Sequence, residues 1–115
     1  MSATSINWVL VTDAPASLDW PDNHLLDLEV EDKKITLAKF KDGYFAFAQK
    51  CPHASGRMAH GYINPLGQVV CPLHRYAFDM KNGRNTSGEG YFLKTYPIEL
   101  RPEGIFIGFK PNSFF

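Results

Sequence analysis

The sequence predicts an all-β protein, and three observations support this fold class. Its 115 residues match the size of one domain, so we expect residues 1–115 to form a single unit. Short runs rich in valine, isoleucine and phenylalanine recur between turn residues such as Asp42-Gly43 and Asn82-Gly83. No stretch reads as a long helix or as a repeat. These features favour a β-sandwich or a small barrel.

The expected strands follow one another at short intervals. Residues 25–30 alternate apolar and acidic side chains, as a half-exposed strand does. The charged residues 31–34 and the residues 41–43 are expected to form turns, the second closing a hairpin. Residues 13–23 contain two prolines and are expected to be a loop with a short helical turn. The complete set of expected strands is 6–12, 25–30, 35–40, 44–48, 68–70, 76–80, 94–100 and 104–109.

Two short cysteine–histidine clusters carry the chemistry of the chain. They read Cys51-x-His53 and Cys71-x-x-His74, with 17 residues between His53 and Cys71. They use both cysteines of the protein and two of its four histidines. A proline after each cysteine restricts the turn that would present a thiolate and an imidazole together. Sulfur and nitrogen ligands suit zinc or an iron–sulfur cluster, so these four residues are the candidate metal ligands.

The rest of the composition excludes several other classes of protein. Formal net charge is zero and lysine and arginine are spread along the chain, which predicts neither a nucleic-acid surface nor a membrane patch. No apolar run approaches the ~18 residues of a membrane span. Residues 1–5 lack the basic start and apolar core of a signal peptide, so we expect a cytoplasmic protein. In that compartment metal ligation by the two cysteines is favoured over a disulfide.

The order and spacing of the four candidate ligands resemble those of the Rieske iron–sulfur proteins. Gly61 after the first loop, Phe78-Asp79 after the second histidine and a closing hairpin after Tyr96-Pro97 extend the similarity to roughly residues 35–109. The resemblance implies a β base with a small cluster-binding subdomain inserted at about residues 50–80.

The same resemblance implies one Rieske-type 2Fe-2S cluster. In such a centre two cysteines hold one iron and two histidines hold the other. Carried onto this sequence, Cys51 and Cys71 would ligate the first iron, and His53 and His74 the second.

Departures from the family pattern predict a potential at the low end of the Rieske range. Gly56 and Leu73 stand where the high-potential Rieske proteins of respiratory complexes carry two further cysteines, so their disulfide is excluded here. Tyr76 and Phe78 stand where those proteins have serine and tyrosine hydroxyls that hydrogen-bond to the cluster. Fewer donors to sulfur lower the reduction potential.

The resemblance implies an electron carrier that is not itself an enzyme. Its expected partners are a flavin-dependent reductase and a terminal oxygenase or similar redox enzyme, because the chain is too short for an oxygenase catalytic domain and has no nucleotide-binding glycine loop. A second hypothesis is a small subunit of a nitrite reductase-like complex, which would co-purify with a large redox subunit. A third is a structural zinc site, because Cys₂His₂ also describes such sites.

Several residues near the ligands have open roles. Arg75 could pair with an acidic partner surface or with a carboxylate of its own chain. Residues 82–90 are rich in glycine and serine where relatives carry prolines that cover the cluster, so Tyr91 and Phe92 are candidates for this cover. His24 and His60 are not needed as ligands. An apolar collar around the cluster would comprise Pro52, Ala54, Met58 and Leu73.

Overall fold

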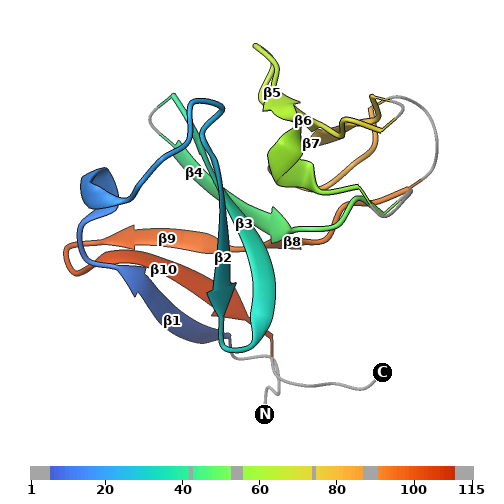
Figure 1. Cartoon of the computed structure of the whole chain (residues 1–115). Coiled ribbons are helices and arrows are strands. Elements are labelled where there is room, and N and C mark those ends of the chain that lie inside the picture. Colours follow the sequence, from blue (N-terminus) through green and yellow to red (C-terminus); the bar gives the residue numbers. More distant parts are fainter. Residues whose placement is uncertain (1–5, 42, 53–55, 74, 87–90, 111–115) are drawn as a thin grey trace.

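The computed structural model describes residues 6–41, 43–52, 56–73, 75–86 and 91–110 (Figure 1). His53, Ala54 and His74 therefore lie outside the described residues. Within those ranges the chain forms three antiparallel sheets and two short 3₁₀ helices, which confirms the all-β prediction. Neither 3₁₀ helix in these ranges has the length of a membrane-spanning segment.

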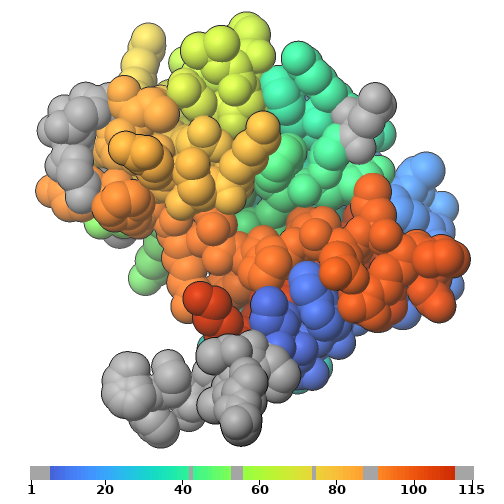
Figure 2. Space-filling view, turned by 180° about the vertical axis from the view of Figure 1, so that it is seen from behind, coloured from blue at the N-terminus to red at the C-terminus, as the bar shows by residue number. Residues whose placement is uncertain are grey.

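Two of the sheets make the base of the molecule, and the third lies beside them at one end (Figures 1 and 2). The first sheet has the order β1 (Asn7–Thr12), β10 (Gly104–Phe109) and β9 (Ile98–Arg101). The second has the order β2 (Leu25–Val30), β3 (Lys33–Phe40), β4 (Gly43–Ala48) and β8 (Thr95–Tyr96). The third has the order β5 (Tyr62–Ile63), β6 (Gln68–Val70) and β7 (Ala77–Asp79). The 3₁₀ helices are η1 (Pro15–Ser17) and η2 (Met58–His60).

Strand β4 connects two separate hydrophobic clusters because its successive side chains point to opposite faces. Ala46 packs with Ile35 and Ile107 between the two base sheets. Phe47 belongs to the other cluster, which joins the base to the third sheet through Val69 and Phe78. Both faces of β4 are therefore buried, and its end leads directly to Cys51.

The predicted strand at residues 94–100 was wrong in one respect, because the chain changes sheets in its middle. Tyr96 pairs with Ala46 of β4, whereas Ile98 pairs with Ile107 of β10. Pro97 separates the two strands because it has no N–H to continue a ladder. Its carbonyl oxygen accepts a hydrogen bond from the N–H of Gly108 at 2.9 Å.

Two predicted turns are shorter than the sequence indicated. Glu31 and Asp32 alone form the β2–β3 turn, with φ of 52° and 66°, so β3 begins at Lys33. In the next hairpin Gly43 already pairs with Phe40. Lys41, with a φ of 56°, takes a left-handed conformation in this turn, whereas Gly43 is already part of β4.

Candidate metal centre

The two cysteines begin two loops that are closed in the same way. The N–H of Cys51 donates a hydrogen bond to the carbonyl of Gly56, and the N–H of Cys71 donates to the carbonyl of Tyr76, both at 2.8 Å. In each case the acceptor lies five residues after the cysteine. Strand-like pairing continues at the neck of each loop, between Lys50 and Arg57 and between Val70 and Ala77. The sequence similarity of the two clusters is therefore reflected in their backbone.

The two thiols are buried and lie side by side. Cys51 is 3% exposed, Cys71 is fully buried, and both are free thiols. Burial, and then a side-chain hydrogen bond with Cys51, raise the pKa of the Cys71 thiol to about 11. The N–H of Leu73 opposes this rise by donating to the Cys71 sulfur. Two thiolates at this place need a positive charge between them, which a metal centre supplies, so the sulfur donors fit an iron–sulfur cluster.

The two loops are in direct contact through Gly56. A Cβ at this position would lie 3.0 Å from Cδ1 of Leu73 and 3.3 Å from the sulfur of Cys71. The absence of a side chain at residue 56 thus allows the first loop to approach the second closely. Gly56 and Leu73 contact each other, and neither provides a thiol for a bridge between the loops.

The structure brings together two of the four predicted ligands. His53 and His74 lie outside the described residues, and within the described part of the chain no group of three or more histidine, cysteine, aspartate or glutamate side chains assembles. The other two histidines are exposed: His24 precedes β2, and His60 ends η2.

Side chains of the base hold the first loop, and sequence reasoning did not find them. The side-chain amide of Asn23 donates to the carbonyls of Ala59 (2.8 Å) and Gly61 (3.1 Å). The amide of Gln49 donates to the carbonyls of Leu28 (3.1 Å) and Ile35 (3.2 Å). All four carbonyl partners are at least 14 residues away in the sequence, so no local motif indicates these contacts.

A carboxylate of β2 holds the same loop from another side. Asp27 forms an ion pair with Arg57 and also accepts a hydrogen bond from the buried hydroxyl of Thr36 at 2.8 Å. Arg57 follows Gly56 directly, so this pair connects the base to the end of the first loop.

The expected apolar cover is only partly present among the described residues. Met58 is fully buried, whereas Pro52 and Leu73 are exposed. The ring of Tyr91 stacks on Tyr76 of the second loop, with 6.0 Å between ring centroids. Phe92 is 66% exposed and covers little.

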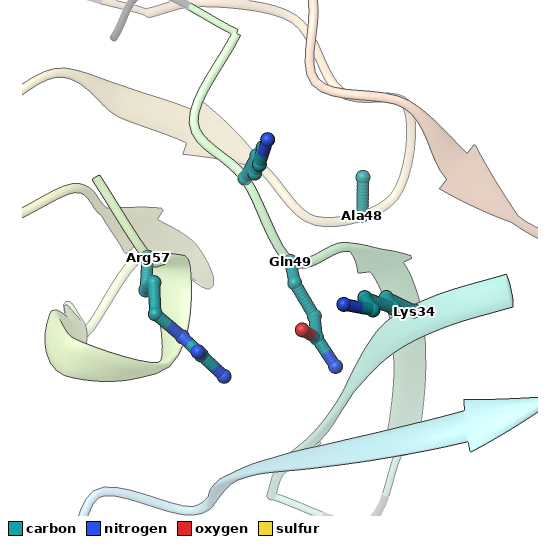
Figure 3. Close-up of a pocket in the computed structure, with 5 residues that line it drawn as sticks. Lys34, Ala48, Gln49 and Arg57 are labelled. Carbon is teal, nitrogen blue, oxygen red and sulfur yellow. The ribbon is translucent and has the colours of Figure 1, made fainter. Parts of the chain in front are cut away.

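A shallow pocket lies at the neck of the first loop (Figure 3). Its lining includes three cationic side chains, Lys34, Lys50 and Arg57, together with Ala48 and Gln49. In Figure 3, Arg57 and Lys34 lie on either side of Gln49. A positive region therefore adjoins the candidate centre.

Comparison with known families shows which family the chain belongs to. The Rieske 2Fe-2S domain family matches residues 7–97. The chain belongs to this family. Its cofactor is accordingly one Rieske 2Fe-2S cluster, and the buried pair of thiols provides a fitting donor set.

Similar proteins come from two kinds of redox system. The ferredoxin component of a naphthalene 1,2-dioxygenase system from Pseudomonas putida is 29% identical over 97 residues, covering 84% of this chain and 89% of the relative. The ferredoxin of carbazole 1,9a-dioxygenase from Nocardioides aromaticivorans IC177 has a TM-score of 0.73 at 19% identity, over 87% of this chain and 95% of that one. A chain in a complex of the oxygenase and ferredoxin of carbazole 1,9a-dioxygenase gives 0.70 at 19% identity, over 87% and 91%.

A second kind of neighbour shares the architecture. A protein from Mycobacterium tuberculosis assigned as the small subunit of an NADH-dependent nitrite reductase has a TM-score of 0.76 at 19% identity, over 91% of this chain and 96% of that one. At this level of identity the structural likeness shows the fold alone.

Proposed function

We propose that this protein is the ferredoxin component of an oxygenase system. In this role it takes single electrons from a flavin-dependent reductase and passes them to a terminal oxygenase. The supporting observation is the pair of adjacent buried thiols, held by two equivalent loops, in a chain of the Rieske family. The ferredoxin identity of its curated relative supports the choice of system.

The proposed ligands are Cys51 and Cys71 for one iron and His53 and His74 for the other. When bound, the cluster supplies reversible one-electron transfer. Burial of Cys51 and Cys71 keeps water from the sulfur side. The N–H of Leu73 donates to the Cys71 sulfur and so stabilises added negative charge. Phe78 is buried and brings no hydroxyl, which supports a potential at the low end of the Rieske range.

In this role the protein carries electrons and catalyses no reaction of its own, so its electron donor and its electron acceptor are separate proteins. It also places the protein in the cytoplasm, where cysteines remain reduced. A nitrite reductase small subunit is the second candidate, supported by the TM-score of 0.76. It is not favoured, because curated relatives that align over most of the chain are ferredoxin components of dioxygenases. Stable co-purification with a large redox subunit would reverse this preference.

The first experiment is absorption and EPR spectroscopy of anaerobically purified protein, before and after dithionite, with metal analysis. We expect two irons per chain, visible absorption that bleaches on reduction, and a rhombic EPR signal from the reduced form. One zinc per chain and no iron would refute the proposal in favour of a structural zinc site.

Single substitutions then test each ligand. Cys51→Ser, Cys71→Ser, His53→Ala and His74→Ala should each abolish the Rieske spectrum. His24→Ala and His60→Ala are the matched controls, because both histidines are exposed, and they should leave the spectrum unchanged. A wild-type spectrum from any of the four ligand variants would remove that residue from the site.

A further inference from the structure

Charge is divided unevenly along this neutral chain. Residues 50–94 contain six lysines and arginines but only two aspartates and glutamates, a formal charge of +4. Because the whole chain has no net charge, the remaining residues carry −4. The basic stretch includes both cysteines and the whole third sheet. Lysine and arginine are spread along the chain, as expected, but the shortage of aspartate and glutamate in residues 50–94 places the candidate metal centre in a positive part of the chain.

Four cations form a basic rim around the two cysteine loops, which we define as Lys34, Lys50, Arg57 and Arg75. The backbones of Lys50 and Arg57 form a β-bridge at the neck of the first loop. Lys34 of β3 lines the same pocket as these two residues (Figure 3). Arg75 lies in the second loop, immediately before the Tyr76 carbonyl that closes it. All four are exposed.

Within the described ranges of the chain, three of these four cations have no ion-pair partner. Among the described residues the ion pairs are Arg57 with Asp27 and Arg101 with Glu99. Lys34, Lys50 and Arg75 thus have no carboxylate of the described chain within ion-pair distance. Arg57 keeps half of its side chain exposed even in its pair with Asp27. The rim can therefore accept further carboxylates without first breaking internal ion pairs.

We propose that the basic rim is the docking surface for a redox protein with an acidic face, an inference that rests on the proposed electron-carrier function. Complementary charge steers two proteins together and selects the orientation in which their charged faces meet. Here that orientation brings the cysteine loops toward the partner. An extended polyanion, such as nucleic acid, fits less well because the remainder of the chain is negative and would repel it.

Oxidation rates with small charged oxidants report the charge of the surface through which the cluster would give up its electron. The measurement does not require the partner protein. In stopped-flow experiments the dithionite-reduced protein, freed of excess reductant, gives one electron to ferricyanide, which becomes ferrocyanide, or to the cationic complex tris(phenanthroline)cobalt(III), which becomes cobalt(II). We expect oxidation by ferricyanide to slow about tenfold as salt is raised, and oxidation by the cobalt complex to accelerate. The opposite salt dependence would overturn the inference.

Two variants with the same change of charge locate the effect. Lys50→Glu should slow oxidation by ferricyanide about threefold at low salt and accelerate the cobalt reaction. Lys110→Glu is the control, because Lys110 follows β10 in the base, away from the third sheet (Figure 1). It should change neither rate. Equal effects of the two substitutions would show that only net charge matters and would refute a local docking surface.

Docking of an acidic protein face is tested with a hexaglutamate peptide as competitor. At low salt the peptide should slow oxidation of the wild type by ferricyanide, and Lys50→Glu should weaken this inhibition. Stronger inhibition by a short DNA duplex would overturn the inference in favour of a nucleic-acid site. The absorption spectrum shows whether a negative result refutes the proposed function or only the docking surface. A protein without the cluster refutes the proposed function, whereas a loaded protein whose rates ignore oxidant charge refutes only the docking surface.

Discussion

The two cysteine loops share their closure but differ in what supports them. Each ends in a hydrogen bond from a cysteine N–H to a carbonyl five residues later. The second loop joins β6 and β7, which pair with each other and bury Val69 and Phe78. The first loop leads instead from β4 of the base to η2 beside the third sheet. Beyond the backbone pairing at its neck, the first loop is held to the base by side-chain hydrogen bonds and an ion pair.

This difference separates local from distant support. The second loop is stabilised by the hairpin that forms it, so its neighbours in sequence provide its contacts. The first loop depends on Asn23, 36 residues before Ala59, and on Asp27, 30 residues before Arg57. We therefore expect the first loop to be the more sensitive of the two to substitutions in the base.

The largest expected effect comes from Gly61, where the supports of the two loops meet. A Cβ here would lie 1.8 Å from the carbonyl oxygen of Val70, the residue before Cys71. Gly61→Ala should therefore displace η2 from β6 and lower the free energy of unfolding by about 3 kcal/mol or more. Gly43→Ala is the control, because its Cβ would meet only ordinary contacts at 3.5 Å, and it should cost less than about 1 kcal/mol. Urea unfolding compares the two variants, and similar losses would contradict the steric argument.

Substitution of Asn23, which holds the first loop to the base, and of Asn64, which lies in the β5–β6 turn of the sheet that carries the second loop, compares how strongly each loop depends on side-chain hydrogen bonds. Asn23→Ala deletes the hydrogen bonds to the carbonyls of Ala59 in η2 and of Gly61 after it. It should cost about 2 kcal/mol and accelerate cluster loss to a chelator. Asn64→Ala deletes bonds to the N–H groups of Leu66 and Gln68 within the β5–β6 turn. Because water can replace these bonds at the exposed turn, the expected cost is about 1 kcal/mol with little change in cluster loss. Faster cluster loss from Asn64→Ala than from Asn23→Ala would reverse the proposed order.

The buried thiol of the second loop predicts a pH dependence of the cluster-free protein. Burial and Cys51 raise the pKa of Cys71 from 9.0 to about 11 in the folded chain. Between these values the unfolded thiol loses its proton first. The stability that the protonated thiol provides is therefore complete below about pH 9 and is lost as the pH rises to about 11. Urea unfolding at pH 8 and pH 10.5 should show a decrease on the order of 1–2 kcal/mol that Cys71→Ser lacks. An equal decrease in the serine variant would assign it to other groups.

The smallest expected effect is that of the ion pair on the first loop. Asp27→Asn removes the charge that faces Arg57 but keeps an acceptor for the buried Thr36 hydroxyl. Because the Arg57 side chain is half exposed, solvent screens the pair and the expected cost is about 0.5 kcal/mol. The difference between variant and wild type should disappear in high salt. A loss that persists there would show that the pair acts through geometry rather than through charge.

Sequence reasoning succeeded where contacts are local and failed where they are distant. Periodicity located the strands except the two-residue β5, and the Cys-Pro pairs located both loops, because these patterns depend on neighbouring residues. Periodicity did not reveal that Pro97 divides one apolar run between two sheets, since only the positions of β4 and β10 decide which strand each half joins. Asn23, Asp27 and Gln49 were likewise missed, because nothing near them in the sequence indicates that they hold the first loop.

The sequence by itself determined the fold class, the four candidate ligands and their family, because strand periodicity and ligand spacing are encoded over short distances. Only the tertiary structure decided that the two thiols lie together and buried, that the base holds one loop by its side chains, and that a neutral chain presents a basic rim at its candidate centre. These features arise from residues far apart in the chain. Their contacts exist only once the sheets have packed against each other.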